Sequence, residues 1–304
     1  MKKIICLLAM LLLVTGCTVG ASTDIRSSEE LDTINNAVAK TLELKDIDYQ
    51  LIILRYGSLE ADKDPFDEFE TAGQKFDFMV KNWRSTSPEI SGTYHDKLFE
   101  HSHGETIFMD KDRVYLISSY SMRRTSDIKA WFENTPENLV RFSKEEFGRI
   151  IEYITMYLKE LPEGAEIKEV ESKTGETEYQ FSLTEEQFTE VFKEYVESVK
   201  HKYINIFGFS TEAETVRSGM ECQGTIKVNS EGYVTEYTMC FKNEEHNPDS
   251  DEPIKFKTYT ISLKFEEPGK DVEIEKPDFS EYQPYITYLN NLPEPEVFWD
   301  GKLY

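Results

Sequence analysis

The sequence has few basic residues and no cluster of them. Its 34 Lys and Arg are outnumbered by 58 Asp and Glu, which gives the 304-residue chain a formal net charge of −24. Nucleic acids and anionic lipid surfaces are bound through clusters of Lys and Arg. The composition therefore excludes nucleic acid as a partner and argues against adhesion to anionic lipid by charge. The acidity indicates a solvated, self-repelling surface rather than a cation-binding role.

The motifs of several common enzyme classes are also absent. There is no nucleophile elbow, no Gly-rich phosphate loop and no HExxH helix. Carboxylate pairs for glycosidic chemistry are set by the fold rather than by spacing, and the sequence favours no particular pair. We therefore expect a non-enzymatic protein without a cofactor. A hydrolase acting on envelope polymers is the weakest alternative.

The N-terminal apolar run is too short to cross a bilayer, which takes roughly 20 apolar residues. Residues 4–14 are mostly aliphatic, follow Lys2 and Lys3, and lead into small residues before Cys17. This layout is typical of a secretory signal that is removed. The expected signal peptide spans residues 1–16.

The four residues that end at Cys17, Val-Thr-Gly-Cys, resemble the lipobox of bacterial lipoproteins. The resemblance implies cleavage before Cys17, a diacylglycerol on its thiol and a palmitate, with residues 17–26 as lipidated cysteine and tether. Two or more acyl chains suffice for stable anchoring. The protein would then be lipid-anchored on the extracytoplasmic face of the cell membrane. The alternative is an ordinary signal peptide cut near Gly20 or Ala21.

Three amphipathic helices are predicted from capping boxes followed by apolar residues at helical spacing. The first begins at Ser27, the second runs from Ser143 to Leu161 before Pro162, and the third runs from Thr184 to Tyr203. The helices are expected to lie against a sheet.

Strands are predicted in most of the remaining chain, which is rich in β-favouring aromatic residues. The expected strands are residues 47–57, 76–80, 106–109, 114–120, 127–132, 222–228, 233–241, 254–265 and 272–274, with a hairpin at 165–183. Residues 47–57 are apolar on both sides, so both faces of this strand should be covered. Residues 58–74 and 243–252 are expected to be loops.

This order of elements behind a lipobox is similar to the LolA and LppX-like superfamily of bacterial lipoproteins, in particular to small lipoproteins of monoderm bacteria. The features that carry the likeness are the early helix leading into residues 47–56, the tyrosine pattern of 112–120, the Gly-Thr-Ile-Lys-Val segment with its Asn-Ser-Glu-Gly turn, and the closing stretch 272–282. The resemblance implies an α+β fold over residues 27–285, a curved antiparallel incomplete β-barrel covered by helices. It also implies a groove between sheet and helices that holds acyl chains.

Two strand faces are candidates for lining such a groove, and the same residues are simply core if the barrel is filled. They are Phe76, Phe78 and Val80, and Tyr259, Ile261 and Leu263. The first hypothesis is a lipoprotein that binds a lipid or other apolar ligand. The alternative is an envelope protein-interaction or sensing module with a filled barrel and no ligand. Its partners would be other envelope proteins.

Two cysteines remain after Cys6 is lost with the signal and Cys17 is modified. Residues 229–232 suit a type I turn that ends in a left-handed Gly and pairs Asn229 with Tyr233. Continued without interruption, this register places Cys222 opposite Cys240 at a distance that a disulfide accepts. We therefore predict a Cys222–Cys240 disulfide. The alternative is two buried structural thiols.

Two further features of the sequence do not define a function. His101 and His103 share a strand face if this stretch is extended, with Glu100 adjacent, but two ligands do not define a zinc site and His95 is too far away. We therefore predict no metal site. Residues 286–304 form a C-terminal tail with aromatic residues, which either packs on its own domain or contacts a partner.

Overall fold

The computed structural model describes residues 26–55, 72–98, 101–120, 128–142, 150–170, 175–199, 201–206, 209–246 and 255–290. The predicted signal peptide, Cys17 and residues 291–304 of the predicted tail lie outside these ranges. In the described part of the chain no helix is long and apolar enough to cross a membrane.

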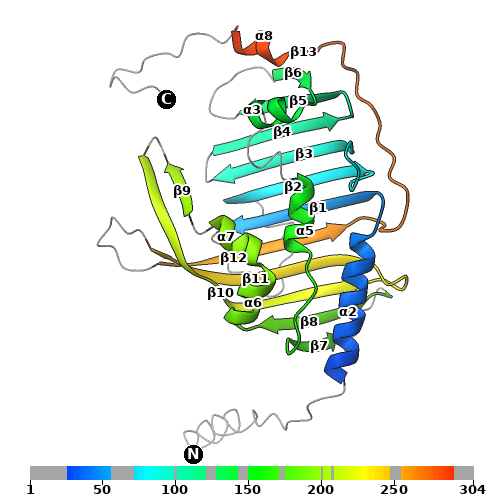
Figure 1. The fold of residues 1–304 in the computed structure, drawn as a ribbon, viewed down its shortest axis with the longest axis vertical. Helices are drawn as coiled ribbons and strands as arrows, with labels where there is room; N and C mark the ends of the chain where they lie inside the picture. Colours follow the sequence, from blue (N-terminus) through cyan, green and yellow to red (C-terminus); the bar gives the residue numbers. More distant parts are fainter. Residues whose placement is uncertain are drawn as a thin grey trace, which may run out of the picture.

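One large open sheet dominates the structure (Figure 1). Its 13 strands follow the order β13-β6-β5-β4-β3-β2-β1-β12-β11-β10-β8-β7, with β9 paired beside β10. All pairs are antiparallel except the short parallel pair of β13 and β6. The strands are β1 (Ile47–Arg55), β2 (Ala72–Lys81), β3 (Glu89–Leu98), β4 (His101–Met109), β5 (Arg113–Tyr120), β6 (Ile128–Glu133), β7 (Glu166–Val170), β8 (Thr177–Leu183), β9 (His201–Ile206), β10 (Phe209–Val228), β11 (Val234–His246), β12 (Lys255–Phe265) and β13 (Gln283–Pro284).

The helices cover one face of this sheet, which we call the inner face (Figure 1). Helices α2, α5, α6 and α7 lie across it, and buried side chains from helices and sheet form one hydrophobic core. The two sheet edges, β7 and β13, do not pair, so the barrel is incomplete. The predicted α+β fold is confirmed. The helices are α2 (Arg26–Leu42), α3 (Pro136–Phe142), α5 (Ile150–Tyr157), α6 (Glu185–Val191), α7 (Lys193–Val199) and α8 (Tyr285–Asn290).

Several elements form as the local sequence predicts. Ile34 and Val38 of α2 are fully buried, and α6 opens with the predicted capping box between Thr184 and Gln187. β1 is buried on both faces, because Leu51 and Ile52 point in opposite directions and neither is exposed.

The second and third helices are shorter than predicted. α5 ends at Tyr157, and Leu158 and Leu161 reach the core from non-helical backbone. The helix expected to run to Tyr203 is interrupted at Phe192 and ends by Val199, after which residues 201–206 form β9. β9 pairs with β10 over six residues, so non-local strand pairing overrides the helical pattern there.

Two loop and strand assignments also change. β11 continues to His246 through part of the expected loop 243–252, because Glu245 pairs with Lys255 of β12. Residues 272–274 are not a strand; they belong to an extended segment that leads from β12 to β13 (Figure 1).

Candidate functional site

The six side chains predicted to line a ligand groove lie in the core beneath the helices. Phe76, Phe78 and Val80 come from β2, and Tyr259, Ile261 and Leu263 come from β12, on either side of β1. The exposed fraction is 8% for Tyr259 and 0% for the other five. A ligand that contacts them must therefore enter between the inner face and its helices.

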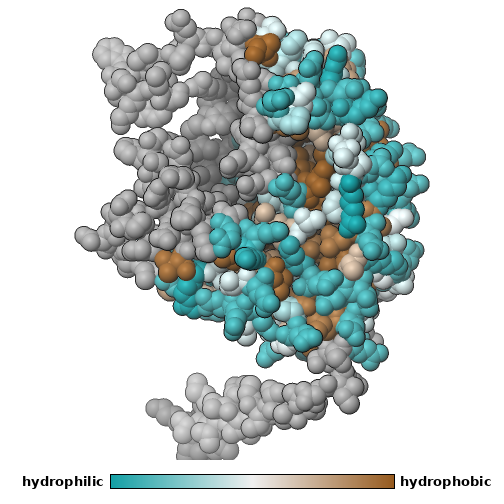
Figure 2. Space-filling model, viewed as in Figure 1, coloured by the Kyte–Doolittle hydropathy of each residue, from teal (hydrophilic) through white to brown (hydrophobic). Residues whose placement is uncertain are grey.

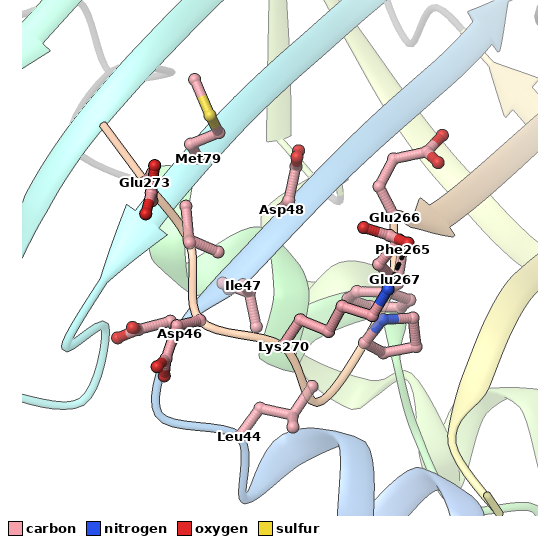
Figure 3. Close-up of a pocket in the computed structure, with 13 residues that line it drawn as sticks. Leu44, Asp46, Ile47, Asp48, Met79, Phe265, Glu266, Glu267, Lys270 and Glu273 are labelled. Carbon is pink, nitrogen blue, oxygen red and sulfur yellow. Dashed lines mark hydrogen bonds and ion pairs between the residues drawn. The ribbon is translucent and has the colours of Figure 1, made fainter. Parts of the chain in front are cut away.

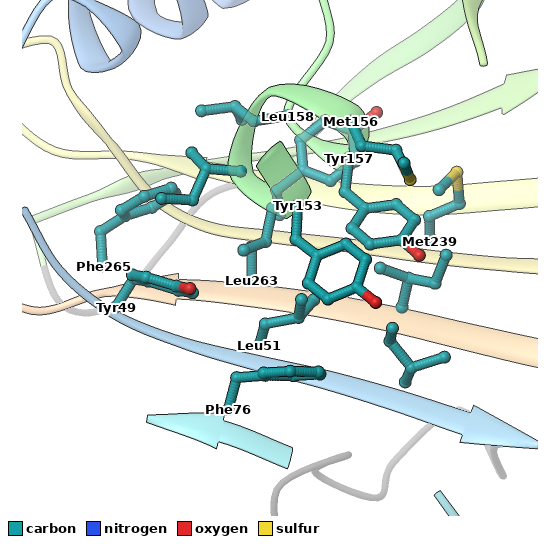
Figure 4. Close-up of a cluster of buried hydrophobic side chains, with 14 of the residues drawn as sticks. Tyr49, Leu51, Phe76, Tyr153, Met156, Tyr157, Leu158, Met239, Leu263 and Phe265 are labelled. Carbon is teal, nitrogen blue, oxygen red and sulfur yellow. The ribbon is translucent and has the colours of Figure 1, made fainter. Parts of the chain in front are cut away.

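Two tyrosine rings of helix α5, Tyr153 and Tyr157, are part of its buried face (Figure 4). The rings of Tyr153 and Phe76 meet edge to face at 5.1 Å, and those of Tyr157 and Tyr195 lie 6.0 Å apart. Tyrosine rings are apolar bodies with a polar tip, so they pack against both hydrocarbon and hydroxylated surfaces. The contact of α5 with the core is therefore partly aromatic and partly aliphatic, because Ile150 and Ile154 are also buried.

Side chains from the body of the domain hold both ends of the α5 segment. At its start, the Tyr49 hydroxyl donates to the Ile150 carbonyl over 2.7 Å. Beyond its end, the Asn35 amide donates to the Leu161 carbonyl at 3.0 Å and accepts from the Leu161 N–H at 2.8 Å. Complete burial raises the pKa of Tyr49 well above its usual value, so this hydroxyl remains a donor. Residues 150–161 thus form a cover tied down at two points, which we call the α5 cover.

The inner face becomes polar toward the end of β1, where β12 begins. Gln74 donates to the Tyr94 hydroxyl at 3.1 Å, and this hydroxyl donates to Asp96 at 3.2 Å. On β4, His103 and Glu105 approach to 3.1 Å with only 11% and 12% of their side chains exposed. Gln74 lies on the same strand face as Phe76 and Phe78, because alternate residues of a strand point to the same side. This alternation could have predicted a polar side chain at this end of the inner face.

The strands on the other side of β1 carry a matching group of polar side chains. Glu245 accepts a hydrogen bond of 2.5 Å from the Tyr259 hydroxyl and forms an ion pair with Lys257. Both charged side chains are largely buried. The inner face is therefore apolar along its middle and hydrogen-bonded at one end.

Hydrophobic surface is visible on the helix-covered side of the molecule (Figure 2). Leu116 of β5 and Met109 of β4 keep exposed fractions of 7% and 8%, whereas Val80 beneath the helices has none. The described inner face is thus buried near β4 and β5 as well, and its exposed fractions there equal those of Ile53 and Tyr259.

Not every buried polar group in the core has a partner. Among the described side chains, the buried atoms without one are the Tyr237 hydroxyl, Asn243 Oδ1 and Thr260 Oγ1. Tyr237 is fully buried, and burial raises its pKa far above the usual value. An unsatisfied buried group of this kind costs roughly 1–3 kcal/mol.

The predicted Cys222–Cys240 disulfide is wrong, because a β-bulge shifts the hairpin register. The turn forms as expected, with Asn229 N–H donating to the Tyr233 carbonyl. However, Val228 pairs with Val234 while Lys227 pairs with Glu236, which leaves Thr235 as an extra residue. Both cysteines are free thiols. A slip of one residue exchanges the two faces of a strand, so the thiols point away from each other.

The predicted histidine pair lies at the start of β4. His101 and His103 occupy alternate positions of this strand, and His103 pairs with Glu105. In the part of the chain that the structure describes, no three His, Cys, Asp or Glu side chains are grouped so as to hold a metal ion.

A pocket on the other side of the sheet was not predicted from the sequence (Figure 3). It has a volume of about 180 Å³ and lies between the first residues of β1, Met79 of β2 and the segment that follows β12. The carboxylates of this pocket come from positions far apart in the chain, so no local sequence motif predicts the pocket.

No protein-family model matches this sequence, and no curated protein matches it. Two solved structures of mycobacterial lipoproteins are similar to it. LprF from Mycobacterium bovis has a TM-score of 0.40 at 8% identity, covering 82% of this chain and 97% of that chain. LppX from Mycobacterium tuberculosis has a TM-score of 0.35 at 7% identity, covering 82% and 99%. LppX belongs by name to the group that the sequence resembles. The likeness is one of chain path and says nothing about a ligand or an anchor.

Proposed function

We propose that this protein is a non-enzymatic lipoprotein, anchored through Cys17 on the extracytoplasmic face of the cell membrane, which binds an apolar ligand between its inner face and the α5 cover. The observation that carries the proposal is the attachment of this cover by tyrosine rings and by the end contacts of Tyr49 and Asn35. Asp96, Glu105 and Glu245 each hold a neighbouring side chain of the inner face in place through a hydrogen bond or an ion pair.

A ligand that binds beneath the α5 cover must compensate for the contacts that the cover loses. The three hydrogen bonds that hold the cover contribute about 3 kcal/mol together, at about 1 kcal/mol each. An acyl chain that buries about ten methylenes gains roughly 8 kcal/mol. Part of this gain offsets the entropy lost on binding. The cover also buries apolar side chains such as Ile154 and Leu158, so a ligand must fill the space beside them as well as release the cover ends.

The polar end of the inner face supports an amphiphilic ligand. An acyl chain would lie along the apolar middle, and a polar group would lie beside Gln74, Tyr94 and Tyr259.

Bound lipid should be detectable in protein purified from its own membrane. Native mass spectrometry and lipid extraction should find lipid with the natural chain. Leu116→Trp places a larger ring at a buried inner-face position and should reduce bound lipid several-fold. Ile117→Trp, on the adjacent residue of the opposite face, should not. Circular dichroism of each variant ensures that only folded protein is compared.

The second candidate is an envelope protein-interaction or sensing module. It is favoured by the complete burial of five of the six predicted groove residues. If neither native mass spectrometry nor extraction finds lipid with the natural chain, the ligand-binding proposal fails and the interaction module takes its place.

The anchor has a separate test. Radiolabelled palmitate should be incorporated into the natural chain and not into Cys17→Ala, which should leave the membrane fraction. Cys222→Ala is the matched control and should be labelled normally. Equal labelling of Cys17→Ala would contradict the anchor without affecting the ligand proposal.

A further inference from the structure

Residues 266–282 form an extended segment, here called the strap, that joins β12 to β13 along the ends of the strands (Figure 1). At its start, Glu266 N–H donates to the Asp48 carbonyl at 2.9 Å. At its far end, Phe279 stacks on Tyr115 with ring centroids 3.6 Å apart. The strap leads into β13, which pairs with the edge strand β6.

The first half of the strap closes the pocket of about 180 Å³ against β1 and β2 (Figure 3). Apolar side chains such as Met79 and Phe265 form part of its wall. Lys270 is the only basic side chain in the lining and is already paired with Glu267. The acidic lining residues are Asp46, Asp48, Glu266, Glu267, Asp271 and Glu273.

The surroundings of Asp48 disfavour the ionised form of its carboxyl group. Desolvation by burial, followed by the negative charges of Asp77 and Glu266, raises its pKa to about 6. Asp46 differs because its carboxylate accepts a hydrogen bond of 2.9 Å from the Asn82 N–H.

The lysine side chains on the strands beside this pocket either pair with other groups or lie at other positions along the strands. Lys264 of β12 pairs with Glu266 at 2.6 Å. On β2, Lys75 lies opposite His95 of β3, where it helps to lower the pKa of this histidine, and Lys81 lies two residues beyond Met79. No cation is among the groups that shift the pKa of Asp48.

We propose that this pocket is a pH-sensitive clasp, which holds the strap on the sheet when its central carboxylate is protonated and loosens the strap when that carboxylate ionises. Opening the strap exposes Asp48 to water and moves Glu266 away, which returns the carboxyl toward its ordinary pKa of 3.8. The closed state therefore binds the proton more tightly than the open one. Closure gains as pH falls through about 6 and gains nothing further below about 4.

The test is hydrogen–deuterium exchange of strap peptides in the full chain, expressed as protection factors so that the intrinsic pH dependence of exchange is removed. Protection of the Glu266 and Lys270 amides, which donate to the Asp48 and Glu267 carbonyls, should fall about tenfold between pH 5 and pH 7.5. One pKa unit corresponds to tenfold, and partial solvent exposure of Asp48 reduces the full shift. Unchanged protection over this range would overturn the proposal.

Variants separate the clasp from general destabilisation. In Asp48→Asn, protection of the strap at pH 7.5 should be at least as high as that of the natural chain at pH 5. Glu273→Gln provides a second, milder reduction of charge in the same pocket and should raise protection at pH 7.5. Asp32→Asn, on an exposed position of α2, should retain the full pH dependence.

Two results would contradict the proposed clasp. One is a pH dependence that persists in Asp48→Asn. The other is a rise in protection at pH 7.5 on adding calcium chloride alone, equal to that produced by acid, because a bound cation rather than a proton would then neutralise the pocket.

Discussion

Cys240 on β11 pairs with Gln223 on β10, so Cys222 lies one residue out of register and on the opposite face. Cys222 is buried, and burial raises the pKa of its thiol to about 12, with a smaller contribution from Cys240. Thiolates are the reactive species, so a thiol with this pKa is almost inert at neutral pH.

The two thiols should therefore stay free and differ in reactivity. Peptide mapping without reductant should find both cysteines alkylated after denaturation in iodoacetamide. In the folded protein at pH 8, Cys240 should react slowly and Cys222 only as the chain unfolds. A linked peptide containing both residues would contradict the bulged register.

Gly219→Ala should be among the most destabilising single substitutions in the described chain. Gly219 has a φ of +83°, and an added Cβ would lie 2.0 Å from the ring of the buried Phe188. Strain and overpacking together should cost about 3 kcal/mol or more in urea unfolding. Gly175→Ala is the matched control, because its φ is +80° but nothing lies within 4 Å, so it should cost only about 1 kcal/mol. Similar losses for both variants would argue against the close contact with Phe188.

Asn35→Ala should loosen the α5 cover. The substitution removes both hydrogen bonds to Leu161 and should cost about 2 kcal/mol. Hydrogen exchange should accelerate mainly in residues 150–161, and exchange of bound lipid should become faster if the proposed ligand is present. Asn36→Ala changes the neighbouring exposed side chain and should alter neither measurement. Uniform acceleration across the domain would indicate a general structural role instead.

Phe279→Ala should release the far end of the strap. The stack on Tyr115 is reinforced by a contact with Phe108 at 5.2 Å, so its loss should cost about 1–3 kcal/mol. Limited proteolysis should then cut within residues 266–282 sooner than in the natural chain. Phe256→Ala removes a ring that is 62% exposed and should leave the cleavage rate unchanged. Equal cleavage rates for the natural chain and Phe279→Ala would show that other contacts hold the strap.

Features that arise from interactions between neighbouring residues could be predicted from the sequence alone. The capping box of Thr184 and Gln187, the buried stripe of α2 and the turn at residues 229–232 follow from local hydrogen bonds and from the spacing of apolar side chains. The alternation of Phe76 and Phe78 likewise placed them in the core. Their burial could be predicted, but whether a ligand reaches them depends on how the helices lie over them.

Features that depend on strand pairing between distant parts of the chain could not be predicted from the sequence. The extra residue at Thr235 set the two cysteines on opposite faces, and pairing with β10 turned residues 201–206 into a strand. The clasp around Asp48 also joins segments more than 200 residues apart in sequence. Strand register and side-chain convergence reflect the energy of the whole sheet, in which one bulge or one new pairing outweighs local preference.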